Sequence, residues 1–544
     1  MMSDKKAVPK KWFYLFLMIW CVQMFTAVYF CFQKQGFHED EYYTFYSTAR
    51  TYGLAIEDGA WMEHDAYFNE FVVLYGQRFQ YGLVKLVQSW DVHPPFYYWI
   101  FHTVCSLFPG QFSKWFGLVI NLAAFGVSMF LLRYLALLVT KHNEKLTLLS
   151  CLFYGFTPAV MSSVVFIRMY ALLTVFVYLC AILHVRMMEK TYHKLPFLKF
   201  LLPLAVVTYL GFLTQYYYFI FLFFMALGFC IYLLLKDRNL WNCIRYGVSV
   251  GIALVLAYLT YPSCLGQMFR GQRGAQATEN FFDWSNTWTR LLFFWKLLDE
   301  YVFGKLLVIL LGIILFLFLF AFGKGKIRIS NRMKAVAFLE NHRACFLLLF
   351  TVIGYFLAVS KTALLLGDTS IRYQTPVYGM TVLLIFVAME GIGRAVFIKA
   401  DTEHGNYNFL LAAAAVVCLL VNLAGLFSGR VVFLYPEDTQ RIAFAREKAA
   451  QDTPVLCLYD VGQSWCVWDS ADEFFVYDRI YFADREKVEP ISDKTIAESD
   501  DLVVYLSNAA DAETQLQRIL NSNSKVDAYE LKWQDRYCSV YYFY

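Results

Sequence analysis

Apolar runs of about 20 residues recur along most of this chain, and each is long enough to cross the hydrocarbon core of a bilayer as a helix. Hydrophobic residues make up 59% of the 544 residues and charged residues 17%, whereas a soluble domain carries about 25% charged residues. A water-soluble protein is therefore excluded. The sequence predicts a polytopic α-helical membrane protein.

The hydropathy pattern predicts eleven transmembrane helices. The first follows a basic N-terminal segment and lacks a small-residue cleavage site, so it is interpreted as a helix rather than as a removed signal peptide. A shorter apolar segment, 93–108, is predicted to form an interfacial or re-entrant helix, because it falls short of a full span. The expected spans lie near residues 12–32, 112–138, 146–166, 169–187, 198–213, 216–235, 245–262, 304–322, 344–359, 374–390 and 408–428.

Lysine and arginine gather in alternate loops, which the positive-inside rule assigns to the cytoplasm. The N-terminus is then cytoplasmic, and residues 33–111, 263–303 and the C-terminal region lie on the extracytoplasmic face. The basic character of the membrane body thus reflects its cytoplasmic loops, and no nucleic-acid motif is present, so no nucleic-acid partner is expected. The basic loops are Lys141–Lys145, Arg186–Lys199, Lys236–Arg245, Lys324–Arg343 and Arg394–Lys399.

The C-terminal region, 429–544, differs in character from the membrane body, 1–428. It holds 12 Lys and Arg residues against 21 Asp and Glu, although the whole chain carries a net charge of +4. Short β-like runs alternate with a helix-like stretch, which predicts a small extracytoplasmic α/β domain. Two of its cysteines could pair if this face is oxidising. The β-like runs are Val455–Tyr459, Leu502–Tyr505 and Cys538–Tyr544, the helix-like stretch is Ala512–Asn521, and the cysteines are Cys457, Cys466 and Cys538.

An acidic motif, His38-Glu39-Asp40-Glu41, follows the first predicted span directly. One of its carboxylates could accept a proton from an attacking hydroxyl, with a pKa set by burial and neighbouring charges. The alternative is a solvated helix N-terminus, where acidic residues are favoured. Asp40 and Glu41 are the candidate catalytic residues.

Basic residues on the same predicted face form a second candidate group. His93 precedes two prolines that begin a helix, and Arg168 lies between two adjoining spans. Arg372 and Tyr373 lie in a later outer turn. Arginines at this depth are costly unless they face water, headgroups or an anion, so the group is a candidate phosphate site. The alternatives are a polar turn at His93 and arginines that reach the lipid headgroups.

The order of these motifs and their common face resemble the GT-C membrane glycosyltransferases over residues 12–428. The likeness is to bacterial relatives of the protein O-mannosyltransferases and of the aminoarabinose transferase of lipid A. Members of that family transfer a sugar from a polyprenyl-phosphate-linked donor on the extracytoplasmic or luminal face. The resemblance implies that Asp40 is the catalytic carboxylate and that Glu41 is its usual neighbour.

The resemblance also assigns the basic group. His93 matches the basic residue before Pro-Pro that reaches the lipid phosphate, and Arg372 with Tyr373 matches the late motif that binds it. Arg168 lies in the second external loop, where some relatives place further site residues. That loop has no Asp-x-Asp, which argues against a metal-dependent mechanism of the oligosaccharyltransferase type. No cofactor is indicated, and a divalent metal stays open.

The predicted activity is that of a hexosyl- or pentosyltransferase that inverts the anomeric centre by direct displacement. Its partners are the lipid-linked donor, membrane lipids, and an acceptor that is a lipid, a glycan or a protein. The outer loop 263–303 could act as a lid or lie on the bilayer as an amphipathic helix. Two other functions stay open: a transporter or flippase of a lipid-linked substrate, and a receptor or assembly factor on a GT-C scaffold.

Overall fold

The computed structural model describes residues 10–49, 54–324, 340–397, 407–462 and 464–544. Parts of two predicted cytoplasmic loops and the basic N-terminal segment lie outside these ranges. The contacts divide the chain into two compact units. The membrane unit comprises Met1–Cys31, Gln88–Tyr97 and Gly117–Val432, and the sheet unit comprises Phe32–Val87, Tyr98–Phe116 and Phe433–Tyr544.

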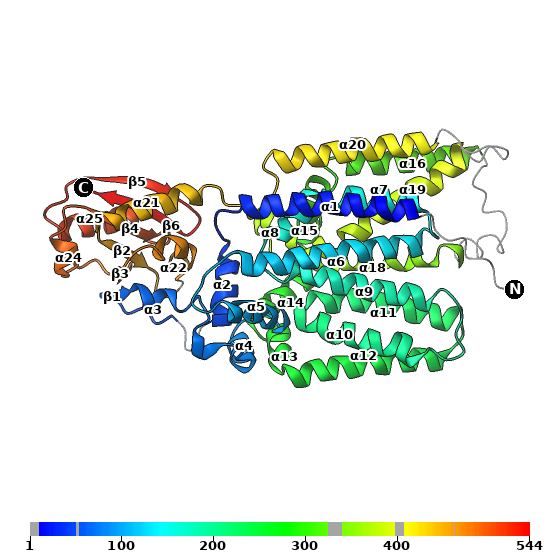
Figure 1. The fold of residues 1–544 in the computed structure, drawn as a ribbon, viewed down its shortest axis with the longest axis horizontal. Coiled ribbons are helices and arrows are strands. Elements are labelled where there is room, and N and C mark those ends of the chain that lie inside the picture. Colours follow the sequence, from blue (N-terminus) through cyan, green and yellow to red (C-terminus); the bar gives the residue numbers. More distant parts are fainter. Residues whose placement is uncertain (1–9, 50–53, 325–339, 398–406, 463) are drawn as a thin grey trace. The chain divides into compact units, whose positions relative to one another are not determined.

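The predicted polytopic helical fold is confirmed by the helices of the membrane unit, which run alongside one another in Figure 1. Among the described residues, eight helices are long and apolar enough to cross a membrane, and a bent pair and two shorter apolar helices follow the same pattern. Each predicted span lies on one of these segments. They are α1 (Lys10–Gln33), α6 (Trp115–Val139), α7 (Glu144–Gly155) with α8 (Pro158–Val165), α9 (Tyr170–Met187), η2 (Phe197–Leu201) with α10 (Leu202–Thr214), α11 (Tyr217–Leu235), α12 (Leu240–Thr260), α16 (Leu307–Gly323), α18 (Arg343–Thr362), α19 (Thr375–Phe397) and α20 (Tyr407–Phe427).

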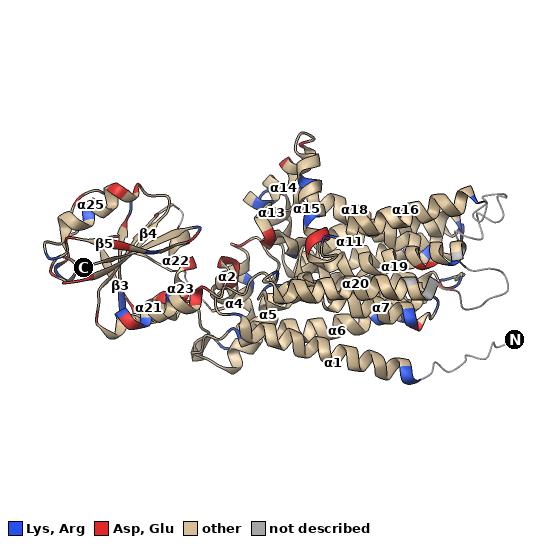
Figure 2. Cartoon of the chain, turned by 90° about the horizontal axis from the view of Figure 1, so that it is seen from above, with Lys and Arg blue, Asp and Glu red and all other residues tan. Residues whose placement is uncertain are grey.

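Charged side chains avoid the middle of these helices. In Figure 2 the helices of the membrane unit are tan along most of their length, with blue and red mainly near their ends. This distribution is the one a helix in hydrocarbon requires, because an ion without a partner there is costly.

The predicted span 146–166 is bent by 57° between α7 and α8. The side chain of Thr157 accepts a hydrogen bond from the Val160 N–H at 3.3 Å, so it caps α8. Pro158 occupies the first turn, where its missing N–H is not needed. The bend separates α8 from α7, and the chain reaches Arg168 directly after α8 ends.

The outer loop 263–303 forms three helices: α13 (Ser263–Phe269), α14 (Gln272–Phe282) and α15 (Thr287–Tyr301). The Lys361 ammonium at the end of α18 donates hydrogen bonds to Asn286 and Thr287 at 2.8 and 3.0 Å. Buried Arg290 donates to the backbone oxygen of Ser360 at 2.9 Å. A lid movement of the corner between α14 and α15 would have to break these bonds.

A six-stranded sheet forms the centre of the sheet unit, and five of its strands lie in the C-terminal region, where the sequence predicted short strands. The strand order is β1-β3-β2-β4-β6-β5, in which β3, β2 and β4 are parallel and the outer pairings are antiparallel. Leucine and valine side chains of β2 and β4 pack with α25 (Ala512–Ser522) in the core. The strands are β1 (Ala60–Glu63), β2 (Val455–Tyr459), β3 (Arg479–Asp484), β4 (Leu502–Ser507), β5 (Tyr529–Gln534) and β6 (Cys538–Phe543).

One edge strand comes from the first external loop. Strand β1 pairs antiparallel with β3, with Ala60 opposite Phe482. The described part of the same loop supplies four α-helices, of which α5 has 12 residues and is the short helix expected after the two prolines. Part of segment 33–111 therefore shares a sheet with the C-terminal region. The four helices are α2 (Glu39–Ala49), α3 (His64–Phe68), α4 (Tyr81–Gln88) and α5 (Phe96–Leu107).

Candidate functional site

The two candidate catalytic carboxylates lie in the first turn of α2, in the sheet unit, but their surroundings differ. Glu41 is fully buried, as is Lys34, and its Oε2 lies 2.8 Å from the Lys34 ammonium. The same oxygen accepts the His38 N–H at 2.7 Å, which caps the start of the helix. Lys34 also donates to the backbone oxygen of Phe433 at 2.8 Å. Glu41 therefore holds α2 in place.

Asp40 is the more accessible carboxylate of the two, because its side chain is 25% exposed. Its Oδ2 lies 3.7 Å from the His38 Nδ1, which also accepts the Asp40 backbone N–H at 3.1 Å. The first turn of a helix favours the ionised form of a carboxylate. The Asp40 side chain is therefore within reach of a small molecule that approaches α2, whereas the Glu41 side chain is not.

Helices from the far end of the sequence support α2 within the sheet unit. The ring of Trp468, on α22 (Trp465–Asp469), lies 5.0 Å from the ring of Tyr43 and 4.5 Å from that of Tyr46. Tyr42 is buried and donates a hydrogen bond to Asp472 of α23 (Ala471–Phe474). Trp468 and Asp472 thus help to position α2. They belong to no recognisable sequence motif, so the sequence alone did not indicate them.

Burial and the neighbouring carboxylates give this region a pH-dependent stability. Burial is the main reason that the pKa of Asp472 rises to about 7, and it also raises the pKa of Asp438 to about 6. The folded state therefore binds more protons than the unfolded chain, so stability is lost as the pH rises through these values.

We expect the sheet unit to lose on the order of 2–4 kcal/mol between pH 5 and pH 8 through Asp472 alone. Asp472→Asn can still accept from Tyr42, so this variant should unfold at a higher temperature than the wild type at pH 8 and depend less on pH. Calorimetry of the detergent-purified chain at both pH values measures this. Asp500→Asn, at an 89% exposed side chain, is the matched control. An unchanged pH dependence in Asp472→Asn would contradict the assignment.

The basic candidates lie in the membrane unit, where Arg168 and His93 are in contact. Arg168 is 2% exposed and lies between α8 and α9. Its Nη2 is 3.2 Å from both ring nitrogens of His93, and the His93 Nδ1 is 3.1 Å from the Asp91 Oδ2. Burial opposes ionisation of Asp91, but the charges of His93 and Arg168 and the His93 hydrogen bond lower its pKa. Asp91 therefore orients His93 as an ionised carboxylate.

Arg372 and Tyr373 end the short helix η3 (Gly367–Tyr373). The Arg372 guanidinium, 4% exposed, lies over the rings of Phe166 and Tyr373 at 5.2 and 5.1 Å, and its Nη2 is 3.2 Å from the Tyr373 hydroxyl. Phe166 precedes Arg168 by two residues. The structure thus brings the segments of all four predicted phosphate-binding residues into one part of the membrane unit.

Gln267 of α13 supports the segment that carries His93, which the sequence did not reveal. Its amide nitrogen donates to the backbone oxygens of Gln88 and Asp91 at 2.9 and 2.6 Å, and its oxygen accepts the Tyr216 hydroxyl at 2.5 Å. Gln267 is 8% exposed. It fastens the segment that ends in Asp91 and His93 to the outer loop.

Metal ligands and cysteines are the other reactive groups of the chain. Within the described ranges, no group of three or more His, Cys, Asp and Glu residues is arranged to hold a metal ion. Cys457, Cys466 and Cys538 are buried, and the sulfurs of the first two are 3.8 Å apart without a bond. Cys466 also shares a side-chain hydrogen bond with Cys538, so on oxidation Cys466 could pair with either of the other two cysteines.

Comparison with known proteins gives relatives by structure. No family model and no curated protein matches the sequence. ArnT from Cupriavidus metallidurans in the apo state is 13% identical, with a TM-score of 0.53 over 98% of each chain. ArnT from the same organism bound to undecaprenyl phosphate is 12% identical, with a TM-score of 0.49 over 98% of each chain. The archaeal oligosaccharyltransferase AglB from Archaeoglobus fulgidus, in complex with an inhibitory peptide and a dolichol-phosphate, is 11% identical, with a TM-score of 0.43 over 95% of this chain and 72% of AglB.

The likeness to apo ArnT extends over nearly the whole chain. It includes the helical membrane body and the C-terminal region that carries most of the sheet. At 13% sequence identity, this likeness shows a shared fold and nothing more. The chain has the GT-C fold that the order and common face of its motifs predicted.

Proposed function

We propose that this protein is a membrane glycosyltransferase that transfers a sugar from a polyprenyl-phosphate-linked donor to an acceptor. The observation that carries the proposal is the buried contact of Arg168 with His93, beside Arg372 and Tyr373, in a GT-C membrane body. The acceptor is a lipid, a glycan or a protein, and the sugar is a hexose or a pentose.

The basic group suits a lipid phosphate. Arg168 and Arg372 are nearly fully buried in a helical membrane unit, and ionisable residues at such positions mark candidate sites for a charged substrate. A guanidinium pairs with two phosphate oxygens at once and is the preferred side chain for such sites. ArnT, whose apo structure shares the fold, has also been solved bound to undecaprenyl phosphate. This supports a polyprenyl phosphate as the leaving group.

In the proposed reaction, Asp40 takes the proton of the acceptor hydroxyl as that oxygen bonds to the anomeric carbon. The bond from this carbon to the phosphate oxygen breaks, and its electron pair leaves with the polyprenyl phosphate. The transition state resembles an oxocarbenium ion with a departing anion, so Arg168, Arg372 and His93 stabilise it by receiving the phosphate charge. A single displacement of this kind inverts the anomeric configuration.

The proposed topology follows the charge of the loops. The N-terminus lies in the cytoplasm, and the sheet unit lies on the extracytoplasmic side of the cell membrane. The support is the alternation of basic and non-basic loops in the sequence.

Release of free polyprenyl phosphate tests the proposed activity. Detergent-purified protein is incubated with a panel of polyprenyl-phospho-sugars, and membrane extract supplies acceptors. The transferase is supported if the wild type releases polyprenyl phosphate from one of the donors and Arg168→Met does not. If no donor is consumed while intact donor crosses the bilayer of proteoliposomes, the protein is a transporter. If neither occurs, the receptor hypothesis is favoured.

Gln267→Leu should raise the KM for the donor about 10-fold while kcat changes little, because the segment carrying His93 loses two hydrogen bonds of about 1 kcal/mol each. Rates of release at several donor concentrations separate the two parameters. Gln272→Leu, at an exposed position of α14, should behave as the wild type. An unchanged KM in Gln267→Leu would show that this fastening does not position His93.

A further inference from the structure

A cavity of about 370 Å³ opens in the sheet unit at the carboxyl end of β3. Ligands of α/β sheets bind outside the carboxyl ends of the parallel strands. The volume falls within the roughly 300–1,000 Å³ of small-molecule sites. The lining side chains that matter here are Asp58, Tyr481, Lys487, Glu489, Ser492 and Arg518. None of them belongs to the groups assigned above.

Backbone hydrogen bonds join the two distant segments that build the wall. The Gly59 N–H donates to the Phe482 oxygen at 2.8 Å, and the Asp484 N–H donates to the Asp58 Oδ1 at 2.8 Å. Gly59 has a φ of +72°, which an L residue rarely adopts, so the turn before β1 needs this glycine. The wall is therefore fixed by the sheet rather than assembled from loose loops.

Arg518 of α25 forms a rigid part of the wall, since it is only 6% exposed. Its Nε donates to the Glu489 oxygen at 2.7 Å, and its Nη1 donates to the Asp484 oxygen at 2.9 Å. Its Nη2 has no hydrogen-bond partner among the described residues. A buried guanidinium held on one side, with a terminal nitrogen to spare, is a preorganised donor.

The charges of the lining balance. Asp58 and Glu489 oppose Lys487 and Arg518, and Asp58 forms an ion pair with Lys487. Hydrogen bonds from Lys487 and from the Asp484 N–H lower the pKa of Asp58, which keeps it an acceptor at neutral pH. A phosphate would meet two carboxylates here, so the lining disfavours a multiply charged anion.

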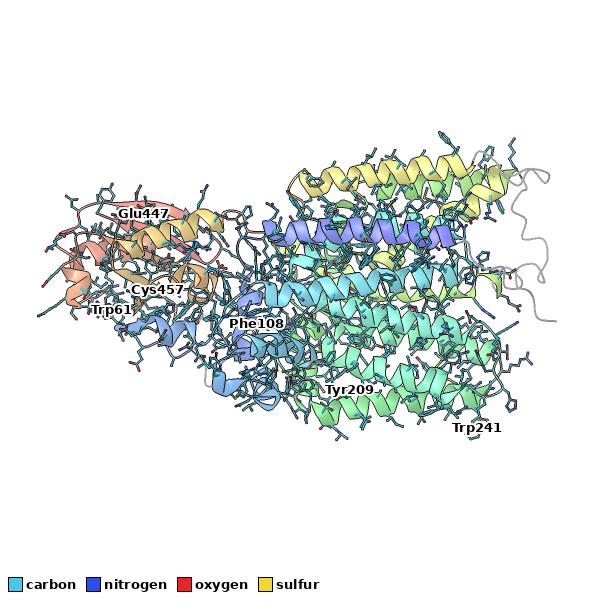
Figure 3. The ribbon with its side chains drawn as sticks, in the orientation of Figure 1. Trp61, Phe108, Tyr209, Trp241, Glu447 and Cys457 are labelled. Carbon is cyan, nitrogen blue, oxygen red and sulfur yellow. The ribbon has the colours of Figure 1, made fainter. Side chains whose placement is uncertain are left out.

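We infer that this cavity binds an uncharged saccharide of one or two rings. A hydroxyl both donates and accepts, so a polyol can pair with the carboxylate oxygens and with the guanidinium together. Tyr481 contributes an apolar ring to the lining. The centroid of that ring lies 5.3 Å from the centroid of the Trp61 ring, with the two planes inclined at 66° (Trp61 is labelled in Figure 3). We assign the cavity to the acceptor glycan, and this assignment rests on the proposed function. The inference that the cavity binds a saccharide does not rest on it.

Binding is tested without any donor. The full chain in lipid nanodiscs is mixed with a panel of methyl glycosides and disaccharides, and saturation-transfer difference NMR reports which sugars bind. Ser492→Phe fills the cavity from an exposed rim position, and Ser524→Phe places the same ring at another exposed serine of the unit. Arg518→Gln, with its unfolding temperature recorded, removes the guanidinium without adding bulk.

The expected result is binding of at least one sugar by the wild type and by Ser524→Phe, with at least a 10-fold loss of affinity in Ser492→Phe and in folded Arg518→Gln. No sugar signal in the wild type, or equal binding in Ser492→Phe, would overturn the inference. So would displacement of every bound sugar by inorganic phosphate at equal concentration. If sugars bind while polyprenyl phosphate is never released, the cavity stands as a saccharide site and the proposed transferase fails.

Discussion

Asp40→Asn is expected to lower the rate of sugar transfer by about 10²- to 10⁴-fold, the usual contribution of a general base. Asparagine has nearly the same size and can still accept a hydrogen bond, so α2 should keep its position. Initial rates of polyprenyl phosphate release, measured at saturating donor, give the effect on kcat. The unfolding temperature of the variant should match that of the wild type.

Asp65→Asn is the matched control, because Asp65 also lies in the first turn of a helix of the same loop and is 86% exposed. Its rate should equal that of the wild type. A normal rate in Asp40→Asn, with the fold intact, would remove Asp40 from the reaction and leave the base unassigned.

Glu41→Gln should act on stability rather than on chemistry, although Glu41 adjoins Asp40. The substitution leaves the Lys34 ammonium buried without its counter-ion, which costs about 3–5 kcal/mol. Thermal or denaturant unfolding of the sheet unit, followed by tryptophan fluorescence, measures the loss. The rate per folded molecule should change little.

A double-mutant cycle separates the two roles of this motif. Lys34→Met combined with Glu41→Gln removes the unpaired charge and should recover much of the lost stability. If Glu41→Gln instead unfolds normally and loses turnover as Asp40→Asn does, Glu41 takes part in the reaction and its structural assignment is wrong.

The sequence alone predicted the membrane helices well, because their signal is a run of apolar residues that needs no tertiary information. In the C-terminal region, the runs at Val455–Tyr459 and Leu502–Tyr505 were recognised as strands for the same local reason, and the structure places β2 and β4 there. The bend at Pro158 was not expected, since the apolar run continues through it.

The features that the sequence did not reveal depend on contacts between distant segments. Strand β1 is short and of mixed polarity, and only its pairing with β3 makes it part of a sheet. Asp40 and Glu41 look alike in sequence, but the burial of Glu41 beside Lys34 separates their roles. Gln267 acts on backbone oxygens of Gln88 and Asp91, for which no sequence motif exists.

The most direct test of the account follows both products of one turnover. A donor labelled in its sugar is mixed with excess wild-type or Asp40→Asn protein and acceptor, and free polyprenyl phosphate and labelled acceptor are counted together. The account predicts one polyprenyl phosphate released for each sugar transferred by the wild type, with inverted anomeric configuration, and neither product from Asp40→Asn on the same timescale. Labelled acceptor with a retained configuration, or transfer by Asp40→Asn at the wild-type rate, would contradict it.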